Sequence, residues 1–196
     1  LIREDKRARL YAFVRKQVAQ GRQVYIVCPA VDQEDPEGLK AAEQYGRQLQ
    51  EEVFPDLRVG IVHGKQKARD KQGVMAAFAA GEVDVLVSTT VIEVGVDVPN
   101  ASLMVVEDAD RFGLSQLHQL RGRVGRGEHP SYCVLLSDNR NELTRKRLKT
   151  LASTTDGFAI AEEDLKLRGP GDVFGARQHG LPQLKLYSLD GDMRLL

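Results

Sequence analysis

Gln116-Leu117-His118-Gln119-Leu120-Arg121-Gly122-Arg123-Val124-Gly125-Arg126-Gly127 is the stretch that constrains the fold of this chain most strongly. Its three arginines within six residues, separated only by Gly and Val, suit neither a helix interior nor a hydrophobic core. Each glycine weakens a helix by about 1 kcal/mol relative to alanine, so the glycines should end a helix that Ser115 could cap. A cationic turn follows, and arginine presents a permanent charge and a planar fork of donors to phosphate oxygens. The simplest alternative is a basic surface turn that contacts solvent or nucleic acid.

The sequence on both sides of this turn alternates between helical and strand-like patterns. Residues 3–20 carry Leu10, Val14 and Val18 at the spacing of one helix face. Residues 24–28 form a nearly continuous apolar run, which is typical of a strand buried on both faces. Helices between such strands predict an α/β domain over residues 1–139, built on a parallel sheet with helices on both faces. Further strands are expected at residues 59–62, 84–88, 103–107 and 132–136, and further helices at residues 35–52 and 67–80.

The composition is that of an ordinary globular protein, since 42% of the residues are hydrophobic and 29% are charged. The formal net charge is +0 at pH 7, so overall charge identifies no partner, although residues 32–56 are acidic and residues 140–185 mildly basic. No apolar run approaches the ~20 residues of a membrane span, and no membrane contact is expected. Cys28 and Cys133 are predicted to be free thiols, which favours the reducing cytoplasm. No Cys or His cluster has metal-ligand spacing, so no metal site is expected.

Polar residues follow two of the expected strands at the edge where ligands collect in parallel sheets. His63-Gly64 follows the second strand, and Ser88-Thr89-Thr90 follows the third. Small hydroxyl residues and free N–H groups at a helix N-terminus form a ready phosphate site. From these residues alone, helix capping by Thr89 and Thr90 and a plain turn at His63 remain the alternatives.

Longer patterns resemble the motifs of superfamily 2 helicases. Gln-x-x-Gly-Arg-x-Gly-Arg at residues 119–126 resembles motif VI, residues 88–99 resemble motif V, and residues 24–31 resemble motif IV. In that family the two motif VI arginines, here Arg123 and Arg126, reach the γ-phosphate of ATP across a cleft. The resemblance also assigns nucleotide contacts to Gln119, Gly95 and Asp97, and contacts with the nucleic-acid backbone to His63, Gly64, Thr89 and Thr90.

The sequence lacks the elements that cradle ATP and Mg²⁺ in such motors. Gly64-Lys65 does not fit a P-loop, and Glu107-Asp108-Ala109-Asp110 departs from a magnesium-binding box. The resemblance is therefore to the second RecA-like domain of a two-domain motor, with ATP and Mg²⁺ bound mainly by a first motor domain outside this chain. This chain alone is not expected to hydrolyse ATP.

Residues 140–196 predict a helical hairpin followed by a long loop. Helices are expected at residues 141–152 and 159–167, with a turn at Asp156-Gly157. The glycine- and proline-rich residues 167–182 also contain apolar side chains, which favours an ordered, functional loop over a flexible linker. Hairpin and loop resemble the translocation motif shared by RecG-type helicases and the bacterial transcription-repair coupling factor. The resemblance implies that Arg147, Arg168 and Gln178 couple nucleotide state to movement on duplex DNA.

Together these patterns predict the C-terminal half of an ATP-dependent double-stranded DNA translocase that remodels branched DNA in repair and recombination. Stalled replication forks and Holliday junctions are the expected substrates, and a wedge domain and a first RecA-like domain would lie outside this chain. Residues 177–182 favour the RecG type, with the coupling-factor type as the alternative. An alternative from another class is a nucleic-acid-binding or regulatory module without catalysis. The presence of Arg123 and Arg126 favours the motor, because a mere binder does not need them.

Overall fold

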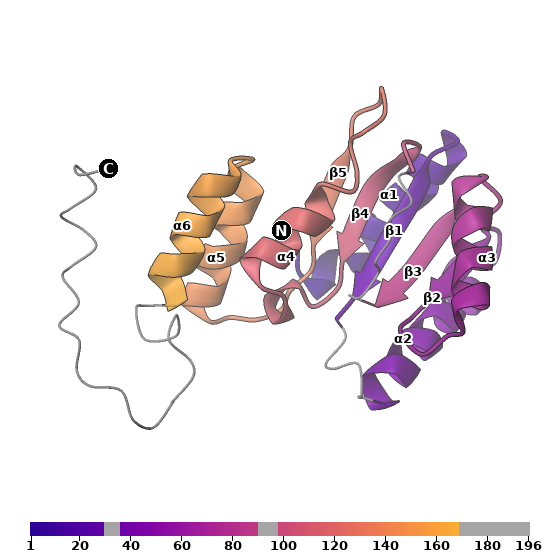
Figure 1. Cartoon of the computed structure of the whole chain (residues 1–196), viewed down its shortest axis with the longest axis horizontal. Coiled ribbons are helices and arrows are strands. Elements are labelled where there is room, and N and C mark those ends of the chain that lie inside the picture. The colour runs from indigo at the N-terminus through magenta and orange to yellow at the C-terminus, as the bar shows by residue number, and fades with distance from the viewer. Residues whose placement is uncertain (30–35, 90–97, 169–196) are drawn as a thin grey trace.

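The computed structural model describes residues 1–29, 36–89 and 98–168. Its centre is a five-stranded sheet in the order β2-β3-β1-β4-β5, in which every neighbouring pair is parallel (Figure 1). The predicted parallel sheet is confirmed, with strand ends that differ from the expected ones by at most a residue or two. The strands are β1 Gln23–Cys28, β2 Val59–Val62, β3 Val85–Thr89, β4 Ala101–Val106 and β5 Tyr132–Leu135.

Helices and helical turns connect the strands. One expectation was wrong: α4 begins at Leu114 after the N-cap residue Gly113, so Ser115 lies inside the first turn and does not cap it. The side-chain oxygen of Gln116 accepts a hydrogen bond from Gly113 N at 3.0 Å instead. The elements are η1 Glu4–Lys6, α1 Arg7–Ala19, α2 Pro36–Gln48, the π-helical turn η2 Leu49–Val53, α3 Ala68–Ala79, η3 Ala109–Arg111, α4 Leu114–Arg121, α5 Glu142–Ser153 and α6 Gly157–Arg168.

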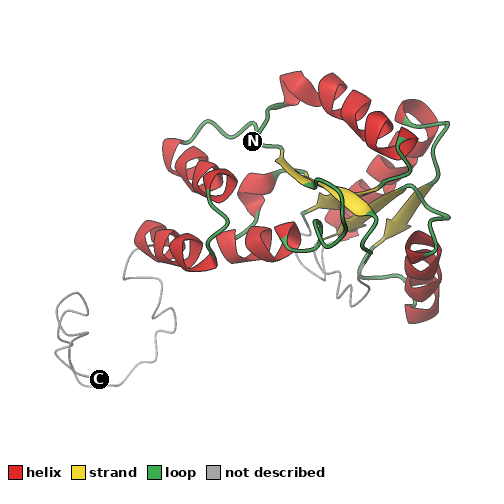
Figure 2. Cartoon of the chain, turned by 90° about the horizontal axis from the view of Figure 1, so that it is seen from above, coloured by secondary structure: helices red, strands yellow, loops and turns green. Residues whose placement is uncertain are grey.

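Both faces of the sheet are covered by helices, as predicted (Figure 2). Val24 and Ile26 of β1 belong to the hydrophobic cluster shared with α1 and α2. Tyr25 and Val27 face the opposite way, into the cluster shared with α3 and α4. All six residues of β1 are buried, so the continuous apolar run in the sequence reflects a central strand with a helical layer on each side.

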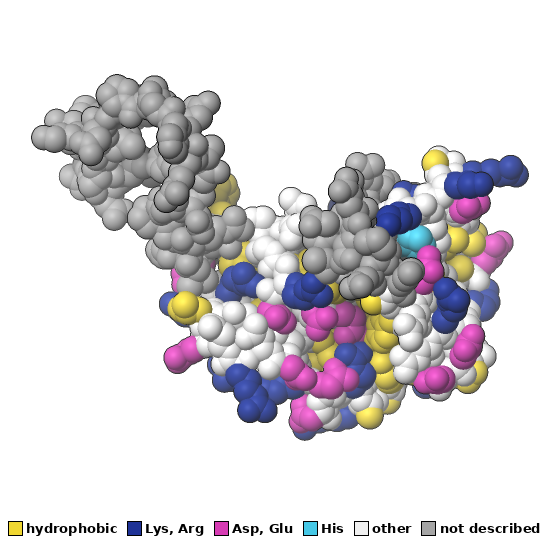
Figure 3. Space-filling model, turned by 90° about the horizontal axis from the view of Figure 1, so that it is seen from below, with side chains coloured by type: hydrophobic (Ala, Val, Ile, Leu, Met, Phe, Trp, Pro, Cys, Tyr) yellow, Lys and Arg dark blue, Asp and Glu magenta, His cyan; other side chains and the backbone are white. Residues whose placement is uncertain are grey.

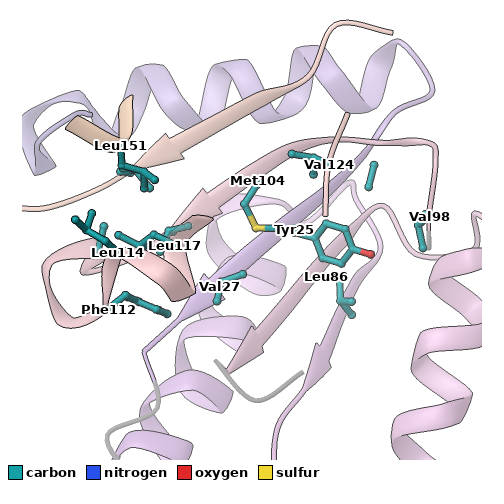
Figure 4. Packing of buried hydrophobic residues seen from close by; sticks show 14 of the residues in the cluster. Tyr25, Val27, Leu86, Val98, Met104, Phe112, Leu114, Leu117, Val124 and Leu151 are labelled. Carbon is teal, nitrogen blue, oxygen red and sulfur yellow. The ribbon is translucent and has the colours of Figure 1, made fainter. Parts of the chain in front are cut away.

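The hairpin of α5 and α6 adds to the cluster on the α4 side. Asn141 caps α5, because its side-chain oxygen accepts hydrogen bonds from Leu143 N at 2.9 Å and Thr144 N at 3.2 Å. Leu151 of α5 lies in the same cluster as Leu114 and Leu117 of α4 (Figure 4). α4 therefore lies between the sheet and the hairpin (Figure 1). The loop expected after the hairpin lies outside the described residues.

Cys28 and Cys133 are free thiols, as predicted. Burial raises the pKa of Cys28 to about 12 and that of Cys133 to about 11. Neither is therefore a reactive thiolate near neutral pH. Within the part of the chain that the structure describes, no helix is both long enough and apolar enough to cross a membrane.

A partly buried ion pair joins α1 to the end of β4. The guanidinium of Arg7 donates to both carboxylate oxygens of Glu107, at 2.8 and 2.9 Å. Glu107 is only 8% exposed and accepts a third hydrogen bond from the Tyr45 hydroxyl of α2 at 2.6 Å. Burial, together with the charge of Glu107, raises the pKa of Tyr45 far above its ordinary value. The pair therefore ties both helices of one layer to the carboxyl end of a central strand.

We expect Arg7→Met to lower the free energy of unfolding of this chain by about 3 kcal/mol, because it leaves the Glu107 carboxylate buried without its cation. Urea denaturation measures the change. Arg47→Met is the matched control, since Arg47 pairs with Glu43 in an exposed i,i+4 contact that contributes at most about 0.5 kcal/mol. Equal losses for the two variants would contradict a structural role for the buried pair.

Candidate functional site

The predicted site residues divide between two opposite edges of the sheet. His63 follows β2 and Thr89 ends β3, and the pairing of Val62 with Ser88 places them side by side at the carboxyl edge. Arg123 and Arg126 lie between α4 and β5. Because β4 and β5 are parallel, this connection must return to the amino edge before β5 begins (Figure 1). The connection that carries the predicted ATP arginines thus runs toward the edge opposite the predicted nucleic-acid contacts His63 and Thr89.

The His63 side chain at the carboxyl edge is buried and is paired within the protein through one of its ring nitrogens. It is 8% exposed, and its Nε2 lies 2.7 Å from a carboxylate oxygen of Glu43 on α2. Two side chains fix the turn after His63. His63 N donates to Gln66 Oε1 at 3.2 Å, and Lys71 Nζ donates to Gly64 O at 3.0 Å. Gly64 is exposed. The main chain of Gly64, rather than the His63 imidazole, is therefore the group that a phosphate can reach.

The residues of β3 that begin the motif V pattern are buried. Ser88 and Thr89 are each 1% exposed, and the Ser88 hydroxyl has no hydrogen-bond partner among the described residues. The predicted contacts at Thr90, Gly95 and Asp97 lie outside the described residues. Their roles, and that of Thr89, stay predictions.

The arginine loop, defined here as residues 122–127, continues directly from α4. Gly122 N donates to His118 O at 3.1 Å and Arg123 N donates to Leu120 O at 3.0 Å, so the first turn is hydrogen-bonded. Val124 packs into the core at 9% exposure and anchors the middle of the loop. Arg123 and Arg126 are exposed, and Arg126 Nε donates to Gly122 O at 3.2 Å. The loop therefore presents two guanidinium groups from a fixed backbone, and Gln119 is exposed about one helical turn before Arg123.

Close packing joins the end of the arginine loop to the end of the motif V segment. A Cβ at Gly127 would lie 2.4 Å from the carbonyl oxygen of Pro99, so only glycine fits. Pro99 stands just before β4, at the amino edge. Thr89 and Pro99 thus place the two ends of the motif V segment at opposite edges of the sheet.

The prediction that all three arginines of this stretch belong to one cationic turn is wrong for Arg121. Its guanidinium donates to Leu151 O at 2.7 Å and to Thr154 O at 2.6 Å, both at the C-terminal end of α5. Arg121 therefore binds the hairpin, while Arg123 and Arg126 lie in the exposed loop.

Arg147 on α5 contacts the segment of chain between β4 and α4. Its Nη2 donates to Asp110 O at 2.6 Å. The Asp110 carboxylate accepts hydrogen bonds from Ser137 Oγ at 2.5 Å and Asn139 Nδ2 at 3.1 Å. Burial alone would raise the pKa of Asp110, but these hydrogen bonds outweigh it and lower the pKa. An acidic residue after a strand is the one sequence feature that points to this cluster. Arg168 ends α6 with a side chain that is not described, and Gln178 lies outside the described residues.

A cleft of about 260 Å³ opens at the carboxyl ends of β1 and β4, lined in part by Arg7, Tyr45, Glu107 and Asp108. The chain leaves these strands in opposite directions, toward β2 and toward β5, and such a crevice is a common ligand position. Acidic and basic side chains are intermixed on the side of the molecule toward which the strands point (Figure 3). Within residues 1–29, 36–89 and 98–168, no group of His, Cys, Asp and Glu side chains could hold a metal ion.

Comparison with known proteins identifies the domain. Residues 5–128 match the model of the helicase conserved C-terminal domain. The chain belongs to this helicase family. Residues 154–196 of the chain match a second model, that of ATP-dependent DNA helicase RecG, domain 3, C-terminal.

The chain is similar along its whole length to RecG proteins. It is 49% identical over 196 residues to the ATP-dependent DNA helicase RecG of Synechocystis and 48% identical over 195 residues to that of Bacillus subtilis. These alignments cover 100% of this chain but 24% and 29% of the relatives, so the chain spans about a quarter of their length. The RecG resemblance predicted from the sequence is confirmed.

Solved structures confirm the RecA-like fold. A structure of RecG bound to a three-way DNA junction matches with a TM-score of 0.73 at 46% identity, covering 88% of this chain and 22% of that chain. Domain 2 of the DEAD-box helicase Mss116p, bound to an RNA duplex, matches with a TM-score of 0.58 at 19% identity, covering 75% of this chain and 54% of that chain. The second likeness concerns the fold alone.

We expect Gly127→Ala to destabilise the helicase domain by about 2 kcal/mol, because the added methyl group must displace Pro99 or the arginine loop. Gly122→Ala is the matched control: its Cβ would meet Gln119 O at an ordinary 3.4 Å, and Gly122 has a helical φ of −69°. We expect the control to change stability by less than about 0.5 kcal/mol. Thermal melting of the two variants distinguishes these outcomes, and equal melting temperatures would rule out the close packing.

Proposed function

We propose that this helicase domain is the second RecA-like motor domain of an ATP-dependent double-stranded DNA translocase that remodels branched DNA in repair and recombination. Stalled replication forks and Holliday junctions are the proposed substrates, and the cytoplasm is the proposed location. The observation that carries the proposal is the similarity to RecG helicases along the whole chain, which extends through residues 154–196 beyond the general helicase domain. RecG itself has been solved in complex with a three-way DNA junction.

ATP is the substrate of the proposed reaction, and a first motor domain would bind it together with Mg²⁺. Phosphoryl transfer is catalysed mainly by positioning and by neutralising the charge that develops on the transferred group. The arginine loop suits this role, since Arg123 and Arg126 are exposed on a backbone anchored by Val124 and by the contact of Gly127 with Pro99. Gln119, Gly95 and Asp97 are the further proposed nucleotide contacts.

DNA would meet the opposite edge of the sheet. The exposed Gly64 main chain, with Thr89 and Thr90, is proposed to contact the phosphate backbone beside His63, whose imidazole is paired with Glu43. The segment between Thr89 and Pro99 joins this edge covalently to Pro99, which packs against Gly127 at the end of the arginine loop. A displacement of the backbone at one edge can therefore be transmitted to the other edge through this segment, which supports a coupling role for motif V.

In the full-length protein, Arg126→Ala should reduce DNA-stimulated ATP turnover by roughly a thousandfold or more while leaving DNA binding intact. Arg123→Ala should be nearly as severe, and lysine should rescue neither, because it lacks the planar fork. The measurement is ATP turnover beside DNA affinity for the same preparations. Arg145→Ala, which removes an exposed arginine from α5, is the control. This 196-residue chain alone should not turn over ATP, and near-normal turnover by Arg126→Ala would refute the assignment.

The predicted coupling residues at the end of the hairpin and in the loop after it, Arg168 and Gln178, can be tested separately. We expect Arg168→Ala and Gln178→Ala to leave folding and DNA-stimulated ATP turnover largely intact while fork unwinding collapses. Loop residues can act in this way because they exchange hydrogen-bond partners as motor domains close, at little cost to stability. ATP turnover, strand displacement and melting temperature should be measured together. Parallel loss of all three would instead indicate a structural loop.

A further inference from the structure

The turn that carries Gly64 leads into a row of exposed basic side chains. Lys65, Lys67 and Arg69 are exposed, whereas Lys71 is half-buried and donates to Gly64 O at 3.0 Å. The three exposed residues, Lys65, Lys67 and Arg69, are called the α3 ridge here, because they span the start of α3. Among the described residues, no acidic side chain forms an ion pair with any of them. Their charge is therefore available to a partner.

The position of these cations is unfavourable for α3 itself. The N-terminal end of a helix carries a partial positive charge and favours anions. Lys67 is the N-cap residue and makes no side-chain cap hydrogen bond, and Arg69 lies in the first turn of the helix. Folding alone therefore does not account for the α3 ridge. An anionic ligand does, because the cations and the positive end of the helix would attract it together.

The backbone that carries the α3 ridge is fixed by hydrogen bonds within the domain. Gln66 Nε2 donates to Ile61 O at 3.0 Å, and Gln66 N donates to His63 O at 3.2 Å. Asp70 N donates to Lys67 O at 3.0 Å. Because the backbone is already ordered, binding of a ligand needs to order only the side chains, which lowers the entropic cost of binding.

The α3 ridge lies at one margin of the carboxyl edge. β2 is the marginal strand, and α3 follows it (Figure 1). Residues 65–71 carry four basic side chains and one acidic side chain, whereas residues 107–111, at the end of β4, carry three acidic and one basic. Arg7 offsets one of these acids by pairing with Glu107, but the difference in sign remains. Three strand spacings separate β2 from β4, which is about 14 Å. A phosphate backbone at this edge is therefore attracted toward β2 and α3.

We infer that the α3 ridge binds the phosphate backbone of the second strand of a DNA duplex whose first strand contacts Gly64 and Thr89. The inference rests on the proposed function, which assigns DNA to this edge. Gly64 and Thr89 lie at the ends of neighbouring strands, so they suit nearby phosphates of a single backbone. The α3 ridge extends the cationic surface from Gly64 along the margin of the sheet, where the complementary backbone of a duplex would lie.

The first test compares two double variants of the full-length protein. Lys67→Gln with Arg69→Gln is the ridge variant, and Arg9→Gln with Lys16→Gln is the matched control, which removes the same residue types from exposed positions on α1. Loss of two phosphate contacts should reduce the slope of log affinity against log salt by about 1.8, so a fourfold rise in salt should weaken duplex binding about twelvefold more for the unmodified protein than for the ridge variant. The control should behave like the unmodified protein.

The second test identifies the strand with uncharged methylphosphonate linkages. They are placed in one strand of a duplex arm of a three-way junction, or in its complement. Neutralising the strand that the α3 ridge binds should weaken binding by the unmodified protein but not by the ridge variant. Neutralising the other strand should weaken both equally. Coupling of the α3 ridge to neither strand or to both, or an effect on affinity confined to one strand, would overturn the inference.

Melting temperature separates a ligand-binding role from a structural one. Removal of cations from the N-terminal end of α3 should leave the melting temperature unchanged or raise it, because these charges oppose the helix dipole. A lowered melting temperature or an unchanged salt slope would overturn the inference. If the unmodified full-length protein binds duplex DNA in the expected way but shows no DNA-stimulated ATP turnover, the proposed function fails while the inference stands.

Discussion

The parallel alignment of the five strands is the constraint on which the arrangement of this domain depends. Because all strands run in one direction, every connection must cross the length of the sheet, and every loop belongs to one of two edges. The exposed turn at Gly64 lies at the carboxyl edge, and the arginine loop lies at the amino edge. The proposed contacts with DNA and with ATP are thus set apart by strand direction.

α4 connects these features because it packs on two sides. Leu114 and Leu117 are fully buried between the sheet and the hairpin, which fixes the position of the helix. The hydrogen bonds from Arg121, at the end of α4, to Leu151 O and Thr154 O then set the orientation of the hairpin. Apolar burial supplies most of the stability of such an interface, but it is non-directional. Hydrogen bonds of a guanidinium to helix-terminal carbonyls supply the direction, so the two interactions have separate roles.

The partly buried ion pair of Arg7 and Glu107 positions the helices on the opposite face of the sheet. It joins α1 and α2 to the end of β4, close to where the chain turns toward α4. Asp108, the next residue, adopts a left-handed backbone conformation with φ of 44°, which costs free energy for a residue other than glycine. Burial raises the pKa of its carboxyl group, and the charge of Glu107 adds to this effect. The carboxyl end of β4 is thus a strained, charged position held by contacts from both helices of one layer.

The sequence by itself determined the strands, the helices and the family, because these depend on local periodicity and on short gapped patterns. The run at residues 24–28 predicted a central strand, and the spacing of Gln119, Arg123 and Arg126 predicted a helicase domain. Only the tertiary structure decided which polar groups are available to ligands. It buried His63 against Glu43, and it directed Arg121 to the carbonyls of α5 while leaving Arg123 exposed two residues later. Adjacent arginines look alike in a sequence, and what distinguishes them is the partner brought near from a distant segment by the packing of α4 against the hairpin.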